Sequence, residues 1–165
     1  MDSDVVKLLL ALFLVVLNGF FVAAEFSIVK VRYSQIQIKA AEGNAMAKQA
    51  EHLIKHLDEY LSATQLGITL ASLALGWVGE SAMHHVIENT LHYFSIALAD
   101  STITTISLVI SFLLLTIMHI VFGELIPKSI AIRKSEQTAM LIAMPLRLFY
   151  TVFKPFIWSM NKMSN

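Results

Sequence analysis

The side chains best suited to chemistry in this sequence are oxygen-bearing groups set within long apolar segments. In the first segment they are Asn18, Glu25 and Ser27. An unpaired charge at the middle of a membrane costs about 3 kcal/mol or more, so such groups usually serve a function. Asn18 and Glu25 share one helical face, whereas Ser27 lies about 160° around the helix from them. The three converge only if the helix bends, which Gly19 permits. The alternative for Glu25 is a side chain near the cytosolic end that reaches water or pairs with Lys30 or Arg32.

The second apolar segment carries a face of small and polar residues. Its members follow one another at spacings of three or four: Gln65, Thr69, Ser72, Gly76 and Gly79. Residues at this spacing lie on one side of a helix, and small residues there favour close helix packing in membranes. A closely packed face can also expose backbone carbonyl oxygens to a cavity. A packing role and a cation-binding role are therefore both compatible with this pattern.

A third polar group lies where the last apolar segment ends, in the sequence GELIPK at 123–128. Pro127 has no amide N–H, so it cannot bond to the carbonyl of Gly123, four residues earlier. That free carbonyl lies beside Glu124 in the chain. Membrane carriers bind cations with carboxylates, free carbonyls and interrupted helices of this kind. The alternative is a surface glutamate paired with Lys128.

Little in the sequence supports thiolate chemistry, a zinc site, an enzymatic activity or nucleic-acid binding. The chain has no cysteine, which excludes thiolate chemistry and disulfides. His52 and His56 have the spacing of a helical zinc pair but lack the glutamate of an HExxH motif, and His119 is expected to pack against a polar neighbour. We find no nucleophile elbow or phosphate-binding glycine loop, so we expect no enzyme. A net charge of zero and a pI near 7.0 do not favour nucleic-acid binding.

Membrane-spanning helices must position these groups. Hydrophobic residues make up 56% of the chain and the mean hydropathy is +0.68, values too apolar for a soluble domain. Crossing a membrane takes roughly 20 apolar residues, and three segments are long enough: 5–29, 61–83 and 103–122. Acidic residues before the first segment argue against a signal peptide. We therefore predict an all-α integral membrane fold with three transmembrane helices.

The distribution of basic residues predicts the orientation. The connection 30–60 contains five Lys and Arg residues, the connection 84–102 contains none, and the tail after 122 is again basic. Cytosolic loops are rich in Lys and Arg, so the first connection and the tail are expected in the cytosol. The N-terminus is then outside and the C-terminus cytosolic, in a plasma or inner membrane.

The remaining segments are expected at the membrane surface. Segment 36–61 predicts one polar helix, and segment 86–98 predicts a short external element. Segment 129–160 mixes apolar with basic residues and contains Pro145 and Pro155. This pattern predicts a kinked amphipathic belt helix on the cytosolic face rather than a fourth span.

Three motifs together resemble one family. They are NGFFVAAEFS at 18–27, QLGITLASLALGWVGE at 65–80 and GELIPK at 123–128. In order and spacing they are similar to the transmembrane domain of the CorC/CNNM magnesium transporters, over nearly all of residues 1–165. The resemblance implies three transmembrane helices, a re-entrant pair of short helices, a cytosolic belt helix and a homodimer in the lipid bilayer. It also implies cytosolic CBS and accessory domains that this chain lacks, so an isolated membrane domain is expected.

The resemblance further implies export of Mg²⁺ by alternating access, with Na⁺ entry as the coupling. It places the magnesium-binding side chains on Ser27, Ser72 and Glu124. Backbone carbonyls near Ala71, Gly76 or Gly123 would complete the shell, and the further polar candidates are Asn18, Glu25 and Thr69.

Two other functions are compatible with the same residues. A magnesium-sensing membrane scaffold that regulates another transporter would use the same site. An exporter of small organic molecules would want an aromatic cavity with an acid such as Glu25, although the oxygen-rich, small-residue face favours a bare cation.

The predicted topology is tested with single cysteines placed at Lys48 and at Ser95. They should react with a membrane-impermeant thiol reagent from opposite sides, because an odd number of spans separates them. Labelling of intact and permeabilised cells measures this, with Ser95→Cys reacting in intact cells. Reaction of both from one side would contradict three crossings.

Overall fold

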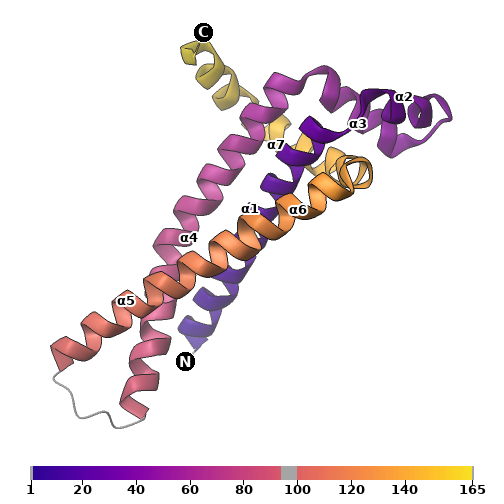
Figure 1. Ribbon diagram of the computed structural model, residues 1–165. Coiled ribbons are helices and arrows are strands. Elements are labelled where there is room, and N and C mark those ends of the chain that lie inside the picture. The colour runs from indigo at the N-terminus through magenta and orange to yellow at the C-terminus, as the bar shows by residue number, and fades with distance from the viewer. Residues whose placement is uncertain (1, 94–99, 165) are drawn as a thin grey trace.

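The computed structural model describes residues 2–93 and 100–164, and all the regular structure in that part of the chain is helical. Helices α1 (Asp2–Lys30) and α4 (Leu57–Tyr93) pack side by side (Figure 1). Helix α5 (Asp100–Met118), the π-helix η1 (His119–Leu125) and α6 (Ile126–Arg133) follow one another as a rod that crosses this pair. The short helices α2 (Tyr33–Ala41) and α3 (Ala45–Lys55) connect α1 to α4, and α7 (Ser135–Ser164) comes last.

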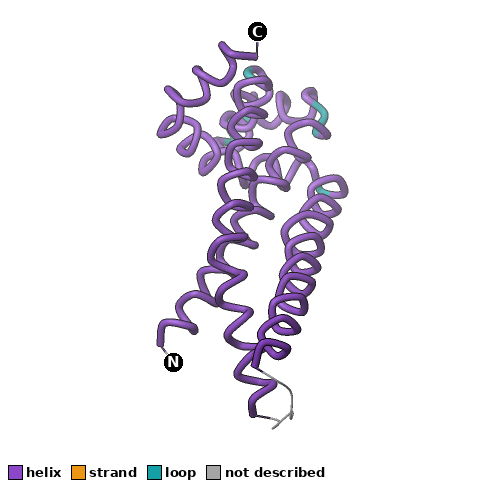
Figure 2. The backbone as a smooth tube through the Cα atoms, turned by 90° about the vertical axis from the view of Figure 1, so that its left-hand side faces the viewer, coloured by secondary structure: helices purple, strands orange, loops and turns teal. Residues whose placement is uncertain are grey.

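The two ends of the molecule differ in the helices that they contain. The N-terminus lies at one end together with the end of α4 and the start of α5. Helices α2, α3, α6 and α7 gather at the other end, as Figure 2 shows from a second side. The basic connection 30–60 and the basic tail therefore share one end, as the distribution of Lys and Arg predicts.

Two buried apolar clusters hold the helices together. The larger cluster lies at the α2–α3 end and joins α1, α3, α4 and α7; in it the rings of Phe21 and Phe149 meet edge to face, 4.7 Å apart. The smaller cluster joins α1, α4 and α5 through these residues: Ala11, Leu14, Val15, Leu75 and Leu115. Between helices in lipid, such contacts stabilise by close packing rather than by removal of water.

Large apolar side chains also face outward. On α5 alone, Leu108, Val109, Phe112, Leu113 and Ile117 are each at least 47% exposed. A soluble monomer seldom exposes so large an apolar surface, whereas lipid solvates it without cost. The fold is that of a multi-pass membrane protein.

Four helical stretches are long and apolar enough to cross a membrane, judged by length and composition: Val5–Lys30, Leu57–Leu91, Ser101–Arg133 and Ser135–Lys162. The first three contain the predicted spans 5–29, 61–83 and 103–122. The fourth is α7, predicted as a surface belt. Its buried residues, among them Ala139, Ile142 and Leu146, pack into the larger cluster at the α2–α3 end. Helix α7 thus lies across one end of the helix pair (Figure 2), a place that suits a belt.

Three predicted boundaries are wrong. Segment 36–61 is not one helix, because the chain turns at Gly43, whose φ of +95° is left-handed, and again at His56. Segment 129–160 divides at Lys134 into α6 and α7, and α7 continues through both of its prolines. Of segment 86–98, residues 86–93 are the end of α4, and the rest lies outside the described residues.

Helix α1 remains helical through Gly19, without a break. The glycine instead permits a close approach: a Cβ there would lie 2.8 Å from Cγ of Pro127 and 3.2 Å from the carbonyl oxygen of Phe122. The rod therefore crosses α1 at this residue. The convergence of Asn18, Glu25 and Ser27 that a bend would allow does not occur.

The small-residue face of α4 is divided between packing and exposure. On this face, a Cβ at Gly79 would lie 2.9 Å from Cδ1 of Leu115. On another face of α4, a Cβ at Gly67 would overlap the ring of Phe21. Gly76 has open space at the same position. Close packing therefore explains Gly79 but not Gly76.

Gly67→Ala should lower the free energy of unfolding by about 1–2 kcal/mol. The added methyl group meets the buried ring of Phe21, and overpacking of this kind costs more than the roughly 1 kcal/mol that alanine gains over glycine in a helix. Gly76→Ala is the matched control, because its methyl group enters open space and should leave stability unchanged or higher. Thermal unfolding in detergent measures both, and equal shifts would contradict the packing described at Gly67.

Candidate cation site

A buried amide joins three helices at the point where the rod crosses α1. Asn18 of α1 is 0% exposed, and its Nδ2 donates to the carbonyl oxygen of Gly123 in η1 at 3.0 Å. Its Oδ1 accepts from the hydroxyl of Ser72 in α4 at 3.2 Å. We call Asn18, Ser72 and Gly123 the polar junction.

The carbonyl of Gly123 is available because of Pro127. An α-helix would pair this carbonyl with the amide of residue 127, which proline lacks. The chain forms a π-helix here, in which the amide of Ile126 bonds to the carbonyl of Val121, five residues earlier. Pro127 deprives the Gly123 carbonyl of its α-helical partner, and this carbonyl accepts a hydrogen bond from Asn18. Gly123 itself is required for the approach, since a Cβ there would lie 3.2 Å from Nδ2 of Asn18.

His119 extends the polar junction by one member. Its Nε2 lies 3.4 Å from Oγ of Ser72. Because the Ser72 hydroxyl donates to Asn18, its oxygen is left to accept from an Nε2–H of His119. The donors then run in one direction, from His119 through Ser72 and Asn18 to Gly123. The prediction that His119 packs against a polar neighbour is confirmed.

A cavity of about 180 Å³ opens beside the polar junction, between α4 and the α5–η1 rod. Its polar lining consists of Ser72, Gly76, Glu80, Thr116 and His119, and its apolar lining of Leu75, Phe112 and Leu115. Ser72, Thr116 and the exposed Glu80 therefore line a space large enough for a cation with several waters. Oxygen ligands of this kind suit hard divalent cations.

The sequence analysis does not single out two polar residues of this cavity, Glu80 and Thr116. Glu80 follows Ser72 and Gly76 at spacings of four, so it lies on the same face of α4, and this spacing is a signal that could have identified it. Thr116 comes from α5, and no spacing within the sequence relates it to Ser72.

Ser27 lies apart from the polar junction. It is 0% exposed, and its Oγ donates to the carbonyl of Ala24 on its own helix at 3.0 Å. At about 1.5 Å per residue it stands roughly 13 Å from Asn18 along α1. Its role as a magnesium ligand stays a prediction.

Glu124 is the predicted carboxylate nearest to the polar junction in sequence, yet its side chain is exposed at the surface of the chain. It makes no ion pair with Lys128, whose Nζ instead lies 4.4 Å from the centre of the Phe26 ring. Glu25 is half-buried, and Lys128 rather than Lys30 is the basic residue whose charge acts on it.

Of the remaining predicted ligands, one lies at the cavity and two lie away from it. Gly76 lines the cavity. Ala71 lines a separate apolar groove between α1, α4 and α7. Thr69 is exposed and donates to the carbonyl of Gln65 at 2.8 Å. The structure thus brings Asn18, Ser72 and Gly123 together with Gly76 beside them, and it leaves Ser27, Glu25, Thr69, Ala71 and Glu124 elsewhere.

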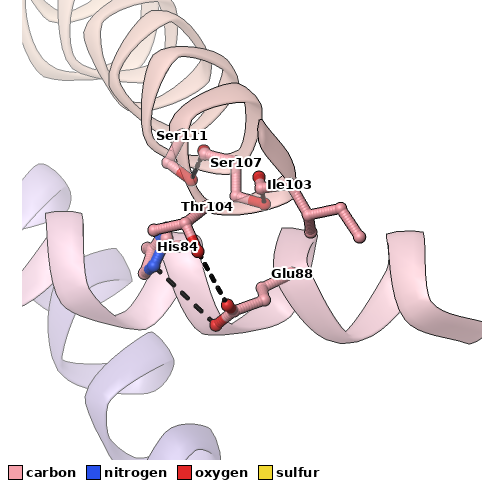
Figure 3. A network of polar contacts seen from close by, with 6 residues as sticks. All are labelled: His84, Glu88, Ile103, Thr104, Ser107 and Ser111. Carbon is pink, nitrogen blue, oxygen red and sulfur yellow. Dashed lines mark hydrogen bonds and ion pairs between the residues drawn. The ribbon is translucent and has the colours of Figure 1, made fainter. Parts of the chain in front are cut away.

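A second polar network lies near the opposite end of α4 and α5 (Figure 3). Glu88 of α4 accepts from Thr104 of α5 at 3.4 Å, and its other oxygen lies 3.8 Å from Nε2 of His84. Ser107 and Ser111 of α5 are buried, and each donates to a carbonyl of its own helix. This network links the two helices far from the polar junction.

Histidine and carboxylate clusters of the usual metal-binding kind are not found in residues 2–93 and 100–164. His52 and His56 stack with ring centres 4.4 Å apart, but no third ligand of these types joins them. Burial lowers the pKa of His52, and the positive charge of protonated His56 lowers it further. A cation in this part of the chain therefore depends on hydroxyl, carbonyl and single carboxylate oxygens.

Comparison with known proteins agrees with the fold. Residues 9–165 match the family model described as the Cyclin M transmembrane N-terminal domain, CNNM. The UPF0053 protein YhdT of Bacillus subtilis (strain 168) is 48% identical over 161 residues, which are 96% of this chain and 34% of that protein. The UPF0053 protein YrkA of the same organism is 44% identical over 156 residues, 94% of this chain and 36% of that protein.

A more distant relative carries a functional name. The polyamine export protein of Haemophilus influenzae is 28% identical over 166 residues, 100% of this chain and 38% of that protein. The chain thus spans about a third of the length of these curated relatives. Because the family model covers all but the first eight residues, this chain belongs to the CNNM transmembrane domain family.

Proposed function

We propose that this domain carries Mg²⁺ across the membrane. The observation that supports the proposal most strongly is the polar junction. There, a buried amide donates to a backbone carbonyl at a helix interruption. Next to it lies a cavity with a carboxylate. Membrane carriers bind ions at interrupted helices for this reason: the interruption frees backbone groups that an intact helix would use.

The oxygen donors favour a hard cation. Mg²⁺ takes six oxygens at about 2.1 Å and sheds water reluctantly, so it usually binds through a few protein groups and several waters. Ser72, Thr116 and Glu80 line one cavity with room for such waters. With a single carboxylate the bound ion keeps a net positive charge, which holds affinity moderate and allows release.

In this proposal, Glu124 binds the ion after a change in the conformation of η1. It is next to Gly123 in the chain, so a motion of η1 that breaks the Asn18–Gly123 bond also moves its carboxylate. Converting the π-helix to an α-helix shifts the register by one residue, about 100° around the axis. In alternating access, Ser72 and Glu80 would serve one state and Glu124 with Ser27 the other. We further propose that the domain exports Mg²⁺, that Na⁺ entry drives this export, and that the protein works as a homodimer.

A second candidate cargo is a polyamine. The relative from Haemophilus influenzae is named for polyamine export, and the cavity here combines Glu80 with the apolar Leu75, Phe112 and Leu115. A carboxylate can pair with an ammonium group while apolar walls contact the methylene chain. A magnesium sensor that regulates another transporter would bind the ion at this same site without moving it.

Flux into proteoliposomes separates these functions. The parent protein should move Mg²⁺, faster with an opposing Na⁺ gradient, and Glu80→Gln and Glu124→Gln should each lower the flux at least tenfold, because each removes a charge and keeps the shape. His52→Ala is the control and should transport normally. Radiolabelled spermidine is measured in parallel.

The outcomes distinguish the candidates. Spermidine flux without Mg²⁺ flux would replace the proposed cargo. Magnesium-dependent thermal stabilisation without any flux would indicate the sensor. Normal Mg²⁺ flux in both glutamine variants would overturn the proposed site.

A further inference from the structure

A polar pocket outside the proposed transport path lies between α2 and the junction of α6 with α7. Its volume is about 440 Å³. The lining includes Lys39 from α2, Arg133 at the end of α6 with Lys134 just after it, and Glu136 and Gln137 from the first turn of α7. It is at the end of the molecule that the basic residues predict to be cytosolic.

The pocket carries unbalanced positive charge. Lys39 forms an ion pair with Glu136, so these two charges offset each other. Arg133 and Lys134 are exposed, and neither makes an ion pair within the described part of the chain. The result is a net charge of +2 around one space. A guanidinium beside an ammonium is a donor set suited to a phosphate group.

An apolar stripe begins at this pocket. Leu141, Met144 and Leu148 follow Gln137 on α7 at spacings of four, three and four, so they share its helical face. They are 73%, 73% and 68% exposed. A cationic pocket that continues into an exposed apolar stripe matches a ligand with an anionic head and an apolar tail.

We propose that this pocket binds the phosphate headgroup of an anionic membrane lipid, with an acyl chain lying along Leu141, Met144 and Leu148. Inorganic phosphate would share the headgroup chemistry but would leave the stripe uncovered. The lipid would tie α2 to the α6–α7 junction, and so fix the belt helix against the membrane surface.

Native mass spectrometry of the protein in a neutral detergent tests this with phosphatidylglycerol, phosphatidylcholine and inorganic phosphate as probes. The parent should retain phosphatidylglycerol in preference to the other two. Arg133→Gln with Lys134→Gln should weaken retention about thirtyfold, since each basic residue near an anionic lipid surface contributes about a factor of five. Lys48→Gln with Lys154→Gln removes the same charge from exposed sites elsewhere and should retain the lipid.

A second variant guards against loss of folding. Gln137→Glu adds a negative charge at the pocket, yet an acid in the first turn of a helix favours that helix. It should lower phosphatidylglycerol retention while the thermal midpoint without lipid is unchanged or higher. Equal retention by the parent, the double variant at the pocket and Gln137→Glu would overturn the site. Retention of inorganic phosphate in place of phosphatidylglycerol would overturn the assignment to a lipid.

Discussion

The hydrogen bond from Asn18 to the carbonyl of Gly123 is the interaction on which the centre of this structure depends. A buried carbonyl without a partner costs about 1–3 kcal/mol, and the hydrocarbon of a membrane offers no hydrogen-bond donor. Pro127 creates that unmet acceptor, and Asn18 meets it at 3.0 Å from a different helix. The helix interruption in the α5–η1–α6 rod is therefore stabilised by the amide that α1 places opposite it.

Each of the three sequence motifs contributes one residue to this contact. The first supplies Asn18 and, beside it, the Gly19 that lets the rod approach. The second supplies Ser72, which donates to the other atom of the same amide. The third supplies Gly123. The adjacent cavity gathers its polar groups where these helices meet, so the geometry that satisfies a backbone carbonyl also builds a place for a cation.

Much of this was predictable because its causes are local. Apolar length gave the positions of α1, α4 and α5, and the missing amide of Pro127 predicted the free carbonyl of Gly123. What the sequence left open depends on partners far along the chain: that Asn18 rather than an ion takes that carbonyl, that Thr116 joins Ser72, and that Glu124 faces outward. The side-chain pattern predicts continuous helices through Gly43 and Lys134, whereas in the structure the backbone turns at both residues and a helix ends there.

A double-mutant cycle between Asn18→Leu and Pro127→Ala tests the central claim most directly, with unfolding measured at equilibrium in mixed micelles. In the parent, Asn18→Leu should cost about 1–3 kcal/mol, because it leaves the Gly123 carbonyl unpaired. In the Pro127→Ala background the new amide at position 127 can bond to that carbonyl, so the same substitution should cost at least about 1 kcal/mol less. Equal costs in the two backgrounds, within about 0.5 kcal/mol, would contradict the account, because Asn18 would then not be compensating for the proline.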